Sequence, residues 1–490
     1  MAGTDDQERA VAIASAATRE GEVPAIGTAA PAMERASFVI PITIGAAFFM
    51  EGLDSTIVAT SMPKIAEALR VTPTEIGVSL TAYLVSVSIW LSASGWLADR
   101  FDAKRVFVAA IGVFVLGSMV CGFSANLLML IAGRFLQGAG GALMTPVGRL
   151  ILARSFPRDQ LVRAMSYMVI PGLLGPMLGP LVGGWITTWF DWRWIFFLNV
   201  PLGVIGSGLA LRFLHHDAPS KGVKFDTAGF LIVAMTLVAI QTGFEVIAAK
   251  GELDGVALVA LGVGLLGAVA YLRHARRPEP ILDLRLFRHR TFRVAVLGGI
   301  FSRLVLGATL FLFPLYFQLG LGASAVVAGY LMAGLALGQI AVRLGVDPLL
   351  KALGVKRLLI SNSAMLGLLL ALLLLFQPGV SLWLLGAFLF VFGLIHSIQL
   401  STLAGLNFSG LPHEELGRAT SLAAVVQRVS MALGISLTAI LLALGSEAGD
   451  PAWLGFRLPT LTLAGLMLVS ALCFRALRRG DGDDLMARKR

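Results

Sequence analysis

The chain has 490 residues, of which 57% are hydrophobic and 14% charged, and its formal net charge is +10. Soluble domains carry about 25% charged residues, so this composition excludes an ordinary cytosolic enzyme, a disordered protein and a secreted disulfide scaffold. A spanning helix needs about 20 apolar residues, and the mean hydropathy of +0.83 therefore predicts a polytopic membrane protein. Cys121 and Cys473 lie in apolar stretches, which indicates neither a disulfide framework nor a Cys-based metal site, and we expect no cofactor.

The N-terminal 35 residues contain no apolar run and lack the basic start and apolar middle of a signal peptide. Their composition predicts a disordered cytoplasmic tail. Fourteen apolar runs follow, each long enough to span a bilayer as a helix, and the short alternating segments of membrane strands are absent from the pattern. The predicted spans lie near residues 37–58, 76–97, 105–123, 127–152, 164–188, 194–213, 227–247, 255–273, 294–318, 324–345, 357–377, 381–405, 418–444 and 457–476.

The basic residues predict the orientation of these spans. With the N-terminus inside, 31 of the 39 Lys and Arg residues fall in the inner loops and tails. Cytoplasmic loops carry such an excess, so we expect both termini in the cytoplasm and an even number of spans. The net charge of +10 is then a topology signal and does not indicate nucleic acid.

The loops between the spans are short, and none is large enough for a soluble catalytic domain. The longest inner loop, about 274–293, has room for a short surface helix. A membrane-embedded enzyme would need paired carboxylates or metal ligands at a loop–membrane boundary, and the sequence shows no His/Asp/Glu cluster of that kind. A receptor or scaffold without transport is a further alternative, which predicts that Asp54→Asn is tolerated.

Six motifs occur in order along the chain, and any one of them alone is weak. The first three are Leu53–Val58 followed by Pro63, Gly95–Arg105 after span 2, and Arg134-Phe135-Leu136-Gln137-Gly138 in span 4. The others are Gly175-Pro176 through Gly183-Gly184, Trp192–Gly203 and Leu282–Phe287. Together they resemble the major facilitator superfamily, and within it the fourteen-helix drug:proton antiporter branch.

This resemblance implies an all-α polytopic membrane protein with the major facilitator fold, two six-helix bundles plus two extra central helices. The expected parts are a tail at 1–35, an N-terminal bundle at 36–215, two extra helices at 216–275, a C-terminal bundle at 276–478 and a basic tail at 479–490. The implied function is proton-coupled export of amphipathic drugs or related small molecules across the cell inner membrane by alternating access. The alternative is a dedicated exporter of one metabolite or lipid, anionic if arginines line its cavity.

The expected partners are the lipid bilayer, a small-molecule substrate and protons. The sequence leaves open whether a periplasmic adaptor joins the transporter.

Charged residues inside a membrane are costly, and they indicate function by default. Glu51 and Asp54 are three residues apart and share a helix face. With span 1 ending near 58, both lie at a depth similar to that of Arg134 in span 4. A carboxylate balanced between burial and an arginine can take up a proton when the geometry changes, so we expect these three residues to couple protons. The alternative places Asp54 at an exposed span end.

Arg303 and Arg428 lie near the middle of spans 9 and 13. Two interpretations are open. In the first, the two arginines line a substrate cavity or pair with the acidic residues of the first half. In the second, their side chains snorkel or cap free backbone groups. Phe49, Tyr83 and Phe313 are candidate apolar walls of that cavity, although they can equally face lipid. His396 in span 12 is either a titrating group or, as is more usual for a lone histidine, a packing residue.

Two motifs concern conformational change. Gly175, Gly179 and Gly183 recur every four residues, and with Pro176 they allow close packing and bending; helix packing alone explains the spacing equally well. In the loop 2–3 signature the resemblance gives Gly95, Asp99 and Arg100 a gating role. The alternative, positive-inside charge, explains Arg100, Lys104 and Arg105 but not Asp99.

In that signature Asp102 stands where the family usually has Gly, and we expect it to keep a positive-φ turn. The second-half copy, Arg343 to Arg357, is degenerate, with Asp347, Gly354, Lys356 and Arg357 as remnants.

Overall fold

The computed structural model describes residues 30–156, 158–216, 224–342, 346–445, 452–478 and 480–482. The predicted tail at 1–35 therefore lies almost wholly outside the described residues, as does most of the basic tail at 479–490. Residues 40–490 form one compact unit, and every contact discussed below lies within it.

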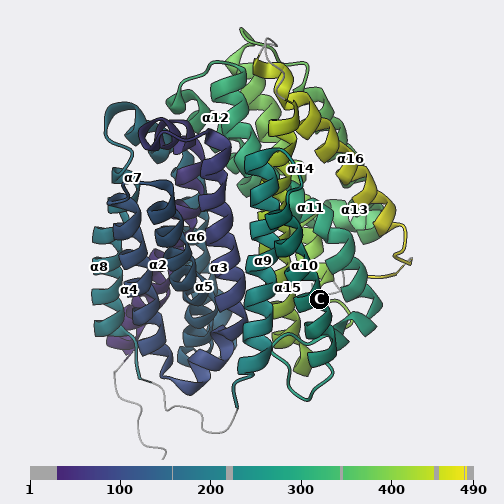
Figure 1. Ribbon diagram of the computed structural model, residues 1–490. Helices are drawn as coiled ribbons and strands as arrows, with labels where there is room; N and C mark the ends of the chain where they lie inside the picture. The colour runs from purple at the N-terminus through teal and green to yellow at the C-terminus, as the bar shows by residue number, and fades with distance from the viewer. Residues whose placement is uncertain are drawn as a thin grey trace, which may run out of the picture. The chain divides into compact units, whose positions relative to one another are not determined.

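The described residues form helices joined by short loops (Figure 1). Thirteen helices are long and apolar enough to cross a membrane, and the 17-residue helix Ala325–Ala341 is a shorter apolar one. These fourteen helices correspond one to one to the predicted spans, so the predicted all-α class is confirmed. In such a chain the hydrogen bonds of the backbone are satisfied inside each helix, which lipid requires.

The first half contributes six spans. They are α2 (Ala30–Leu69), α3 (Pro73–Arg100), α4 (Ala103–Gly122), α5 (Leu127–Ser155), α6 (Arg158–Trp189), and α7 (Trp194–Phe197) continued by α8 (Asn199–Phe213). The start of α3 illustrates why these helices begin where they do, because Thr72 and Glu75 form a reciprocal capping box before it.

The accessory pair follows as α9 (Thr227–Lys250) and α10 (Gly255–His274), each capped by an aspartate, Asp226 and Asp254. The next loop, which has room for a short helix, contains the five-residue 3-10 helix η1 (Leu284–Arg288). The accessory helix α9 contacts both α3 and α15, which also contact each other.

The second half repeats the six-span order. Its helices are α11 (Arg290–Leu315) with η2 (Tyr316–Gly320), α12 (Ala325–Ala341), α13 (Val346–Leu373), α14 (Leu382–Leu406) with η4 (His413–Glu415), α15 (Leu416–Gly445), and η5 (Ala452–Phe456) with α16 (Arg457–Phe474). Each half has its own helix pairs, such as α4 with α5 and α12 with α14.

One predicted boundary is wrong by a wide margin. The first span was expected to end near 58, but α2 continues to Leu69. Its last turns contain Lys64 and Glu67, which form an exposed ion pair. Hydropathy detects the apolar part of a helix, and it misses a more polar extension of the same helix.

Candidate functional site

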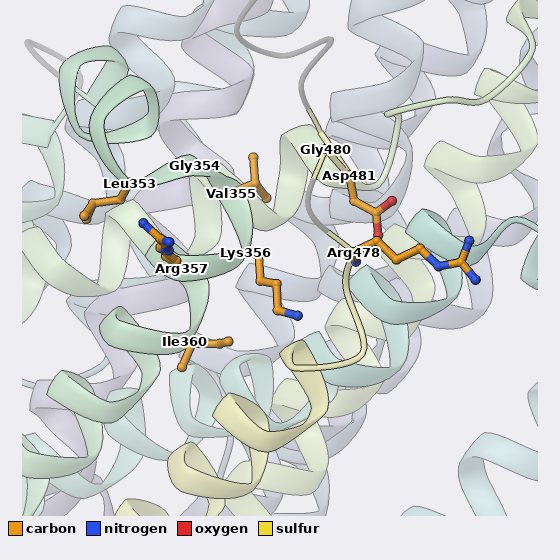
Figure 2. Close-up of a pocket in the computed structure, with 9 residues that line it drawn as sticks. All are labelled: Leu353, Gly354, Val355, Lys356, Arg357, Ile360, Arg478, Gly480 and Asp481. Carbon is orange, nitrogen blue, oxygen red and sulfur yellow. Dashed lines mark hydrogen bonds between the residues drawn. The ribbon is translucent and has the colours of Figure 1, made fainter.

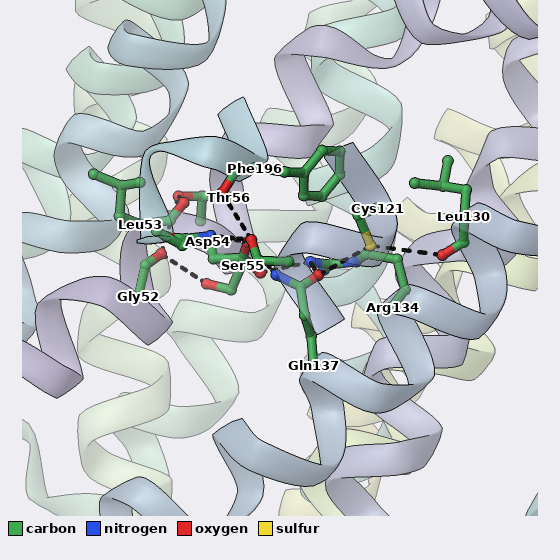
Figure 3. A network of polar contacts seen from close by, with 12 residues as sticks. Gly52, Leu53, Asp54, Ser55, Thr56, Cys121, Leu130, Arg134, Gln137 and Phe196 are labelled. Atoms are coloured by element: carbon green, nitrogen blue, oxygen red, sulfur yellow. Dashed lines mark hydrogen bonds and ion pairs between the residues drawn. The ribbon is translucent and has the colours of Figure 1, made fainter. Parts of the chain in front are cut away.

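A buried carboxylate on α2 is held by three polar groups from two other helices (Figure 3). Asp54 and Arg134 on α5 are both fully buried, and their side chains are 2.5 Å apart. Gln137 and Asn199 each donate an amide N–H to the second carboxylate oxygen, at 2.9 and 2.8 Å. The donors on α5 and α8 therefore converge on one charge, as a buried ion must be both paired and hydrogen-bonded to be tolerated.

Arg134 is only partly satisfied by this arrangement. Its Nη1 also donates to Gln137 Oε1 at 2.9 Å, and its guanidinium lies 4.4 Å from the ring centre of Tyr83 on α3. Its Nε and Nη2 atoms, and the hydroxyl of Tyr83, are buried without a hydrogen-bond partner among the described residues. Arg134 thus has donors left over for a polar group that approaches Asp54 or Tyr83.

The extension of α2 changes the depth expected for Asp54. Fifteen residues separate Asp54 from the helix end at Leu69, which is about 22 Å at 1.5 Å per residue. Asp54 is also 0% exposed. The structure therefore places it deep in the bundle rather than at an exposed span end, because tertiary packing covers a position that sequence spacing put near the surface.

Glu51 does not join the Asp54–Arg134 pair. It accepts a hydrogen bond from Thr145 on α5 at 2.8 Å, and its nearest basic group is Arg428 on α15, at 3.6 Å. The predicted cluster of three residues is thus two separate pairs. One lies inside the first half, and the other joins α2 to a helix of the second half.

A small pocket of about 50 Å³ lies between the two halves, next to both pairs. Its lining includes Tyr83 and Arg134 from the first half and Arg428 from the second. Two predicted cavity residues, Tyr83 and Arg428, therefore meet here. The lining joins apolar walls to two guanidinium groups, each with a carboxylate beside it.

The structure places the other predicted cavity residues elsewhere. Arg303 is 2% exposed and donates to the carbonyl oxygens of Ala295 and Val296 on its own helix, and it forms no ion pair with any described residue. It therefore caps backbone groups, the alternative that the sequence left open. Phe313 packs against Phe392 in the core of the second half, and Phe49 is partly buried against the core.

The second half carries a polar network of its own without charge. Gln399 on α14 donates to Ser302 and Ser363 at 3.2 and 2.9 Å. Asn362 donates to Gln399, and Ser302 lies 3.0 Å from Ser470.

The residues of this network come from the first, third, fourth and sixth helices of their half. The network around Asp54 uses the same four helices of the first half, through Asp54, Ser118, Gln137 and Asn199. The two networks are equivalent by helix order, but only the first contains ionisable groups.

The glycines of α6 pack directly against α2. A Cβ at Gly179 would lie 2.1 Å from Thr56 Oγ1, and one at Gly175 2.4 Å from the carbonyl oxygen of Phe49. Gly183 similarly meets the carbonyl oxygen of Ile57 at 2.5 Å. These small residues bring the two backbones into contact, as in close membrane helix pairs.

The prolines of α6 are accommodated by hydroxyl groups of α2. Pro180 has no N–H to donate to the carbonyl of Pro176, four residues earlier. The hydroxyl of Thr56 lies 3.4 Å from that carbonyl oxygen, and the hydroxyl of Thr60 lies 3.3 Å from the carbonyl oxygen of Pro180. The motif in α6 is therefore complemented by threonines on α2, which the sequence pattern alone did not pair.

The loop 2–3 signature lies at what we call the basic end, the end of the helices where Arg100, Arg154 and Arg418 are found. Asp99 pairs with Arg154 on α5 at 2.9 Å, and Arg100 is exposed. Gly95 is exposed and has no atom within 4 Å of the position its Cβ would occupy. The conformational role of these residues stays a prediction.

The expected positive φ at Asp102 is wrong. Asp102 has a φ of −47° and caps α4, accepting a hydrogen bond from the backbone N–H of Lys104 at 3.2 Å. Its carboxylate also contacts His216. An aspartate suits this position because N-cap side chains accept the free N–H groups of a first helical turn.

The remnants of the signature in the second half line a separate cavity of about 420 Å³. Gly354 (φ 69°), Lys356 and Arg357 contribute from α13, and Arg478 and Asp481 from the C-terminal segment (Figure 2). Lys356 donates to the carbonyl oxygen of Arg475 at 2.9 Å. Asp347 lies outside the residues whose side chains are described, as does Arg343.

Sequence reasoning missed several polar residues of the interior. Asn199 lies in a recognised motif, but nothing in its local sequence points to Asp54, 145 positions away. Glu245 was missed although a single acidic residue in the apolar run 227–247 was a visible signal. His396 is 1% exposed and stacks on Phe392, which fits the packing interpretation.

Sequence comparison finds relatives along most of the chain. The family profile described as Major Facilitator Superfamily matches residues 44–435 and 297–485. Proteins named multidrug resistance protein MdtD are similar to this chain: one from Pectobacterium carotovorum subsp. carotovorum (strain PC1) is 37% identical over 402 residues, covering 82% of this chain and 86% of the relative. Another, from Cronobacter sakazakii (strain ATCC BAA-894), is 36% identical over 415 residues, covering 82% and 87%.

Solved structures with low sequence identity share the fold. A bacterial homolog of the human lysosomal transporter Spinster, described as inward-facing and unoccupied, has a TM-score of 0.66 at 14% identity and covers 92% of this chain and 98% of its own. A D-xylose–proton symporter has a TM-score of 0.63 at 15% identity, with 89% and 96% covered. The profile match, the identity to MdtD proteins and the shared fold confirm the expected family: the chain belongs to the major facilitator superfamily.

Proposed function

We propose that this chain is a proton-coupled antiporter that exports amphipathic drugs or related small molecules across the cell inner membrane by alternating access. The observation that carries the proposal is the fully buried Asp54–Arg134 pair beside the pocket between the halves. The family and the relatives named multidrug resistance proteins support a multidrug-type transporter. An ionisable pair deep in a membrane bundle is costly and is typical of proton pathways.

Proton uptake would change contacts at two places. A proton on Asp54 cancels the charge that Arg134 faces, which leaves the guanidinium with Gln137 and Tyr83. A proton on Glu51 weakens its attraction to Arg428 on α15, a contact that joins the halves. Proton binding on α2 is thereby linked to the interface that must open and close.

The contacts between the halves favour one stage of the transport cycle. Toward the end opposite the basic end, a Cβ on Gly184 of α6 would lie 2.4 Å from the carbonyl oxygen of Ala325 on α12, and Gln318 donates to the carbonyl oxygen of Thr60 at 3.1 Å.

At the basic end, Asp99–Arg154 and Asp283–Arg418 each join residues of one half. This pattern is consistent with halves that are closed opposite the basic end and separated at it.

The charge of the pocket bears on the substrate class. Of the two mid-span arginines, only Arg428 lines the pocket, and Glu51 lies beside it. Arg134 likewise faces Asp54. Paired charges of both signs suit cations and zwitterions after proton exchange, and they offer less support to an exporter dedicated to an anion.

The test is a proteoliposome assay with an imposed pH gradient and a cationic dye. We expect Asp54→Asn to lower gradient-driven dye flux at least tenfold, because the asparagine keeps an acceptor for Arg134 but binds no proton. Glu51→Gln is measured separately, and we expect a smaller loss because its contact with Arg428 is longer. Asp191→Asn, which removes an exposed acid paired with Arg193, is the matched control.

Two outcomes would contradict the proposal. Dye flux that does not depend on the imposed gradient would remove proton coupling. Full gradient-driven flux in both Asp54→Asn and Glu51→Gln would show that these carboxylates do not carry the protons.

A further inference from the structure

The accessory helix α9 places a carboxyl group at the junction of the two halves. Glu245 lies on α9, which contacts α3 of the first half and α15 of the second (Figure 1). Its Oε1 accepts hydrogen bonds from Thr81 on α3 at 2.8 Å and from Ser436 on α15 at 2.9 Å. Gln241, one turn earlier on α9, donates to the same oxygen at 2.6 Å. One side chain thus connects three helices that belong to three parts of the fold.

Glu245 has no cation beside it. It forms no ion pair with any residue that the structure describes. On α9 the nearest basic residue is Lys250, which pairs with Asp254 at the start of α10. On α15, Arg428 lies eight residues away and pairs with Glu51.

The remaining charged groups of the packed helices lie near their ends. They are Glu75, Asp99 and Arg100 on α3, Arg273 and His274 on α10 and Arg418 on α15. A lone carboxylate in a membrane interior is expensive, whereas the protonated acid is an ordinary hydrogen-bonding group.

The hydroxyl groups around Glu245 have alternative acceptors. Thr81 Oγ1 also lies 3.0 Å from the carbonyl oxygen of Val78, and Ser436 Oγ lies 3.3 Å from that of Ala432. Each hydroxyl has one proton to donate, so both can turn from the carboxyl group to the backbone of their own helix. The site can therefore accommodate the acid or the carboxylate without leaving a buried donor unpaired, a property that a proton-binding site needs.

We propose that Glu245 is a second proton-binding site of this transporter, built by the accessory helix at the α3–α15 junction. Its proton is held while the three helices are packed together and is released when α3 and α15 separate and water reaches the carboxyl group. The role in transport rests on the function proposed above, whereas proton binding is measurable without transport. The accessory pair then has a chemical role and does not serve only as packing.

The first experiment measures the proton directly. Infrared difference spectra are recorded on the full-length protein in liposomes during a pH titration. We expect a protonated-carboxyl stretch that vanishes as the pH rises in the wild type and in Glu252→Gln, an exposed acid seven residues away. The band should be missing from Glu245→Gln. Identical spectra in the wild type and Glu245→Gln would overturn the proposal.

A second variant tests the site if Glu245→Gln does not fold. Replacing the two hydroxyl donors by Thr81→Val and Ser436→Ala leaves the carboxyl group in place. Because these donors stabilise the carboxylate more than the acid, we expect the midpoint of the infrared titration to move to higher pH. An unchanged midpoint in the double variant would show that the band arises elsewhere.

The transport readout separates this proposal from the previous one. In proteoliposomes we expect Glu245→Gln to lower gradient-driven dye flux at least threefold while dye exchange without a pH gradient stays within twofold of the wild type. Loss of both activities in Glu245→Gln would indicate a structural role and contradict the proposal. Full flux in Asp54→Asn, with the infrared band at Glu245 intact, would remove the function proposed for Asp54 and leave the proton site standing.

Discussion

Asp226 organises the accessory pair through a single carboxylate. It caps α9 by accepting from the backbone N–H of Gly229 at 3.0 Å, and it also accepts from His274 at the end of α10 and from the N–H of Ile281. Burial tends to raise the pKa of Asp226, but these hydrogen bonds to the charged form outweigh it, so that the pKa lies below the ordinary value. The folded protein thus binds protons at this site more weakly than the unfolded chain does.

This shift predicts a pH-dependent effect of Asp226→Asn. A carboxylate with a lowered pKa in the folded state contributes stability above the unfolded value of about 3.9, and the contribution is lost as the pH falls through the folded value. At pH 7 we expect the variant to lose about 1 kcal/mol, because hydrogen bonds to a charged group are favourable but solvent partly screens this half-buried carboxylate. Thermal unfolding in detergent at pH 7 and near pH 3 measures the loss, which should shrink at the lower pH. A pH-independent loss, or an equal loss in Asp191→Asn, would contradict this explanation.

Arg303 shows what sequence cannot say about a single side chain. Its position near the middle of a span is evident from the pattern of apolar residues. Its direction is not, because a long side chain can reach toward a cavity or back along its own helix. The glycine at 299 leaves space for the guanidinium, since a Cβ there would lie 2.8 Å from Arg303 Nη1. That local fit decides where the side chain goes.

At the scale of helices, the glycines of the α6 motif lie directly against α2. We predict that Gly179→Ala destabilises the protein by about 1–3 kcal/mol, the usual cost of overpacking, because the new methyl group would meet Thr56 Oγ1 and the carbonyl oxygen of Leu53. The measurement is thermal unfolding in detergent together with gradient-driven dye flux.

The matched control for Gly179→Ala is Gly208→Ala on α8, where a Cβ would meet no atom within 4 Å. Alanine is favoured over glycine inside helices by about 1 kcal/mol, so this variant should be as stable as the wild type or more so. Equal stability of both variants would show that α2 and α6 are not held at the distance seen here.

The helices themselves could largely be predicted from hydropathy. Each apolar run of sufficient length became a helix, since a chain in lipid must satisfy its backbone hydrogen bonds locally. The extent of α2 could not be predicted, because its last eleven residues are amphipathic and their helix is supported by packing, with Met62 and Ile65 fully buried.

At the scale of the molecule, the proposed alternating access predicts that hindering closure at one end changes exposure at the other. Gly329 on α12 faces α6, and its Cβ would lie 2.5 Å from the carbonyl oxygen of Pro180. We predict that Gly329→Ala disfavours closure opposite the basic end and shifts the population toward halves that close at the basic end. A cysteine in place of Gly95, exposed in this arrangement, should then react several-fold more slowly with a polar thiol reagent.

That labelling experiment uses a Cys473→Ser background, since Cys121 is buried and a polar reagent does not reach it easily. Gly334→Ala is the control on the same helix, because its Cβ would meet its nearest atom at an ordinary 3.6 Å. Unchanged labelling at position 95 in Gly329→Ala would argue against coupled movement of the two ends.

The sequence by itself determined the class of the protein. Composition, the lengths of the apolar runs and six ordered motifs were enough to predict fourteen helices and the major facilitator family, because these properties depend on local chemistry and on the thickness of a bilayer. The same local information located Asp54, Glu51 and Arg134 as costly buried charges.

Only the tertiary structure decided which of those charges meet. Asp54 is 80 positions from Arg134 and 145 from Asn199, and Glu51 pairs with a residue of the other half. Glu245 likewise acquires its partners from helices 164 and 191 positions away. Partners of this kind depend on how helices rotate and pack against one another, a long-range property that the periodicity of a single helix does not contain.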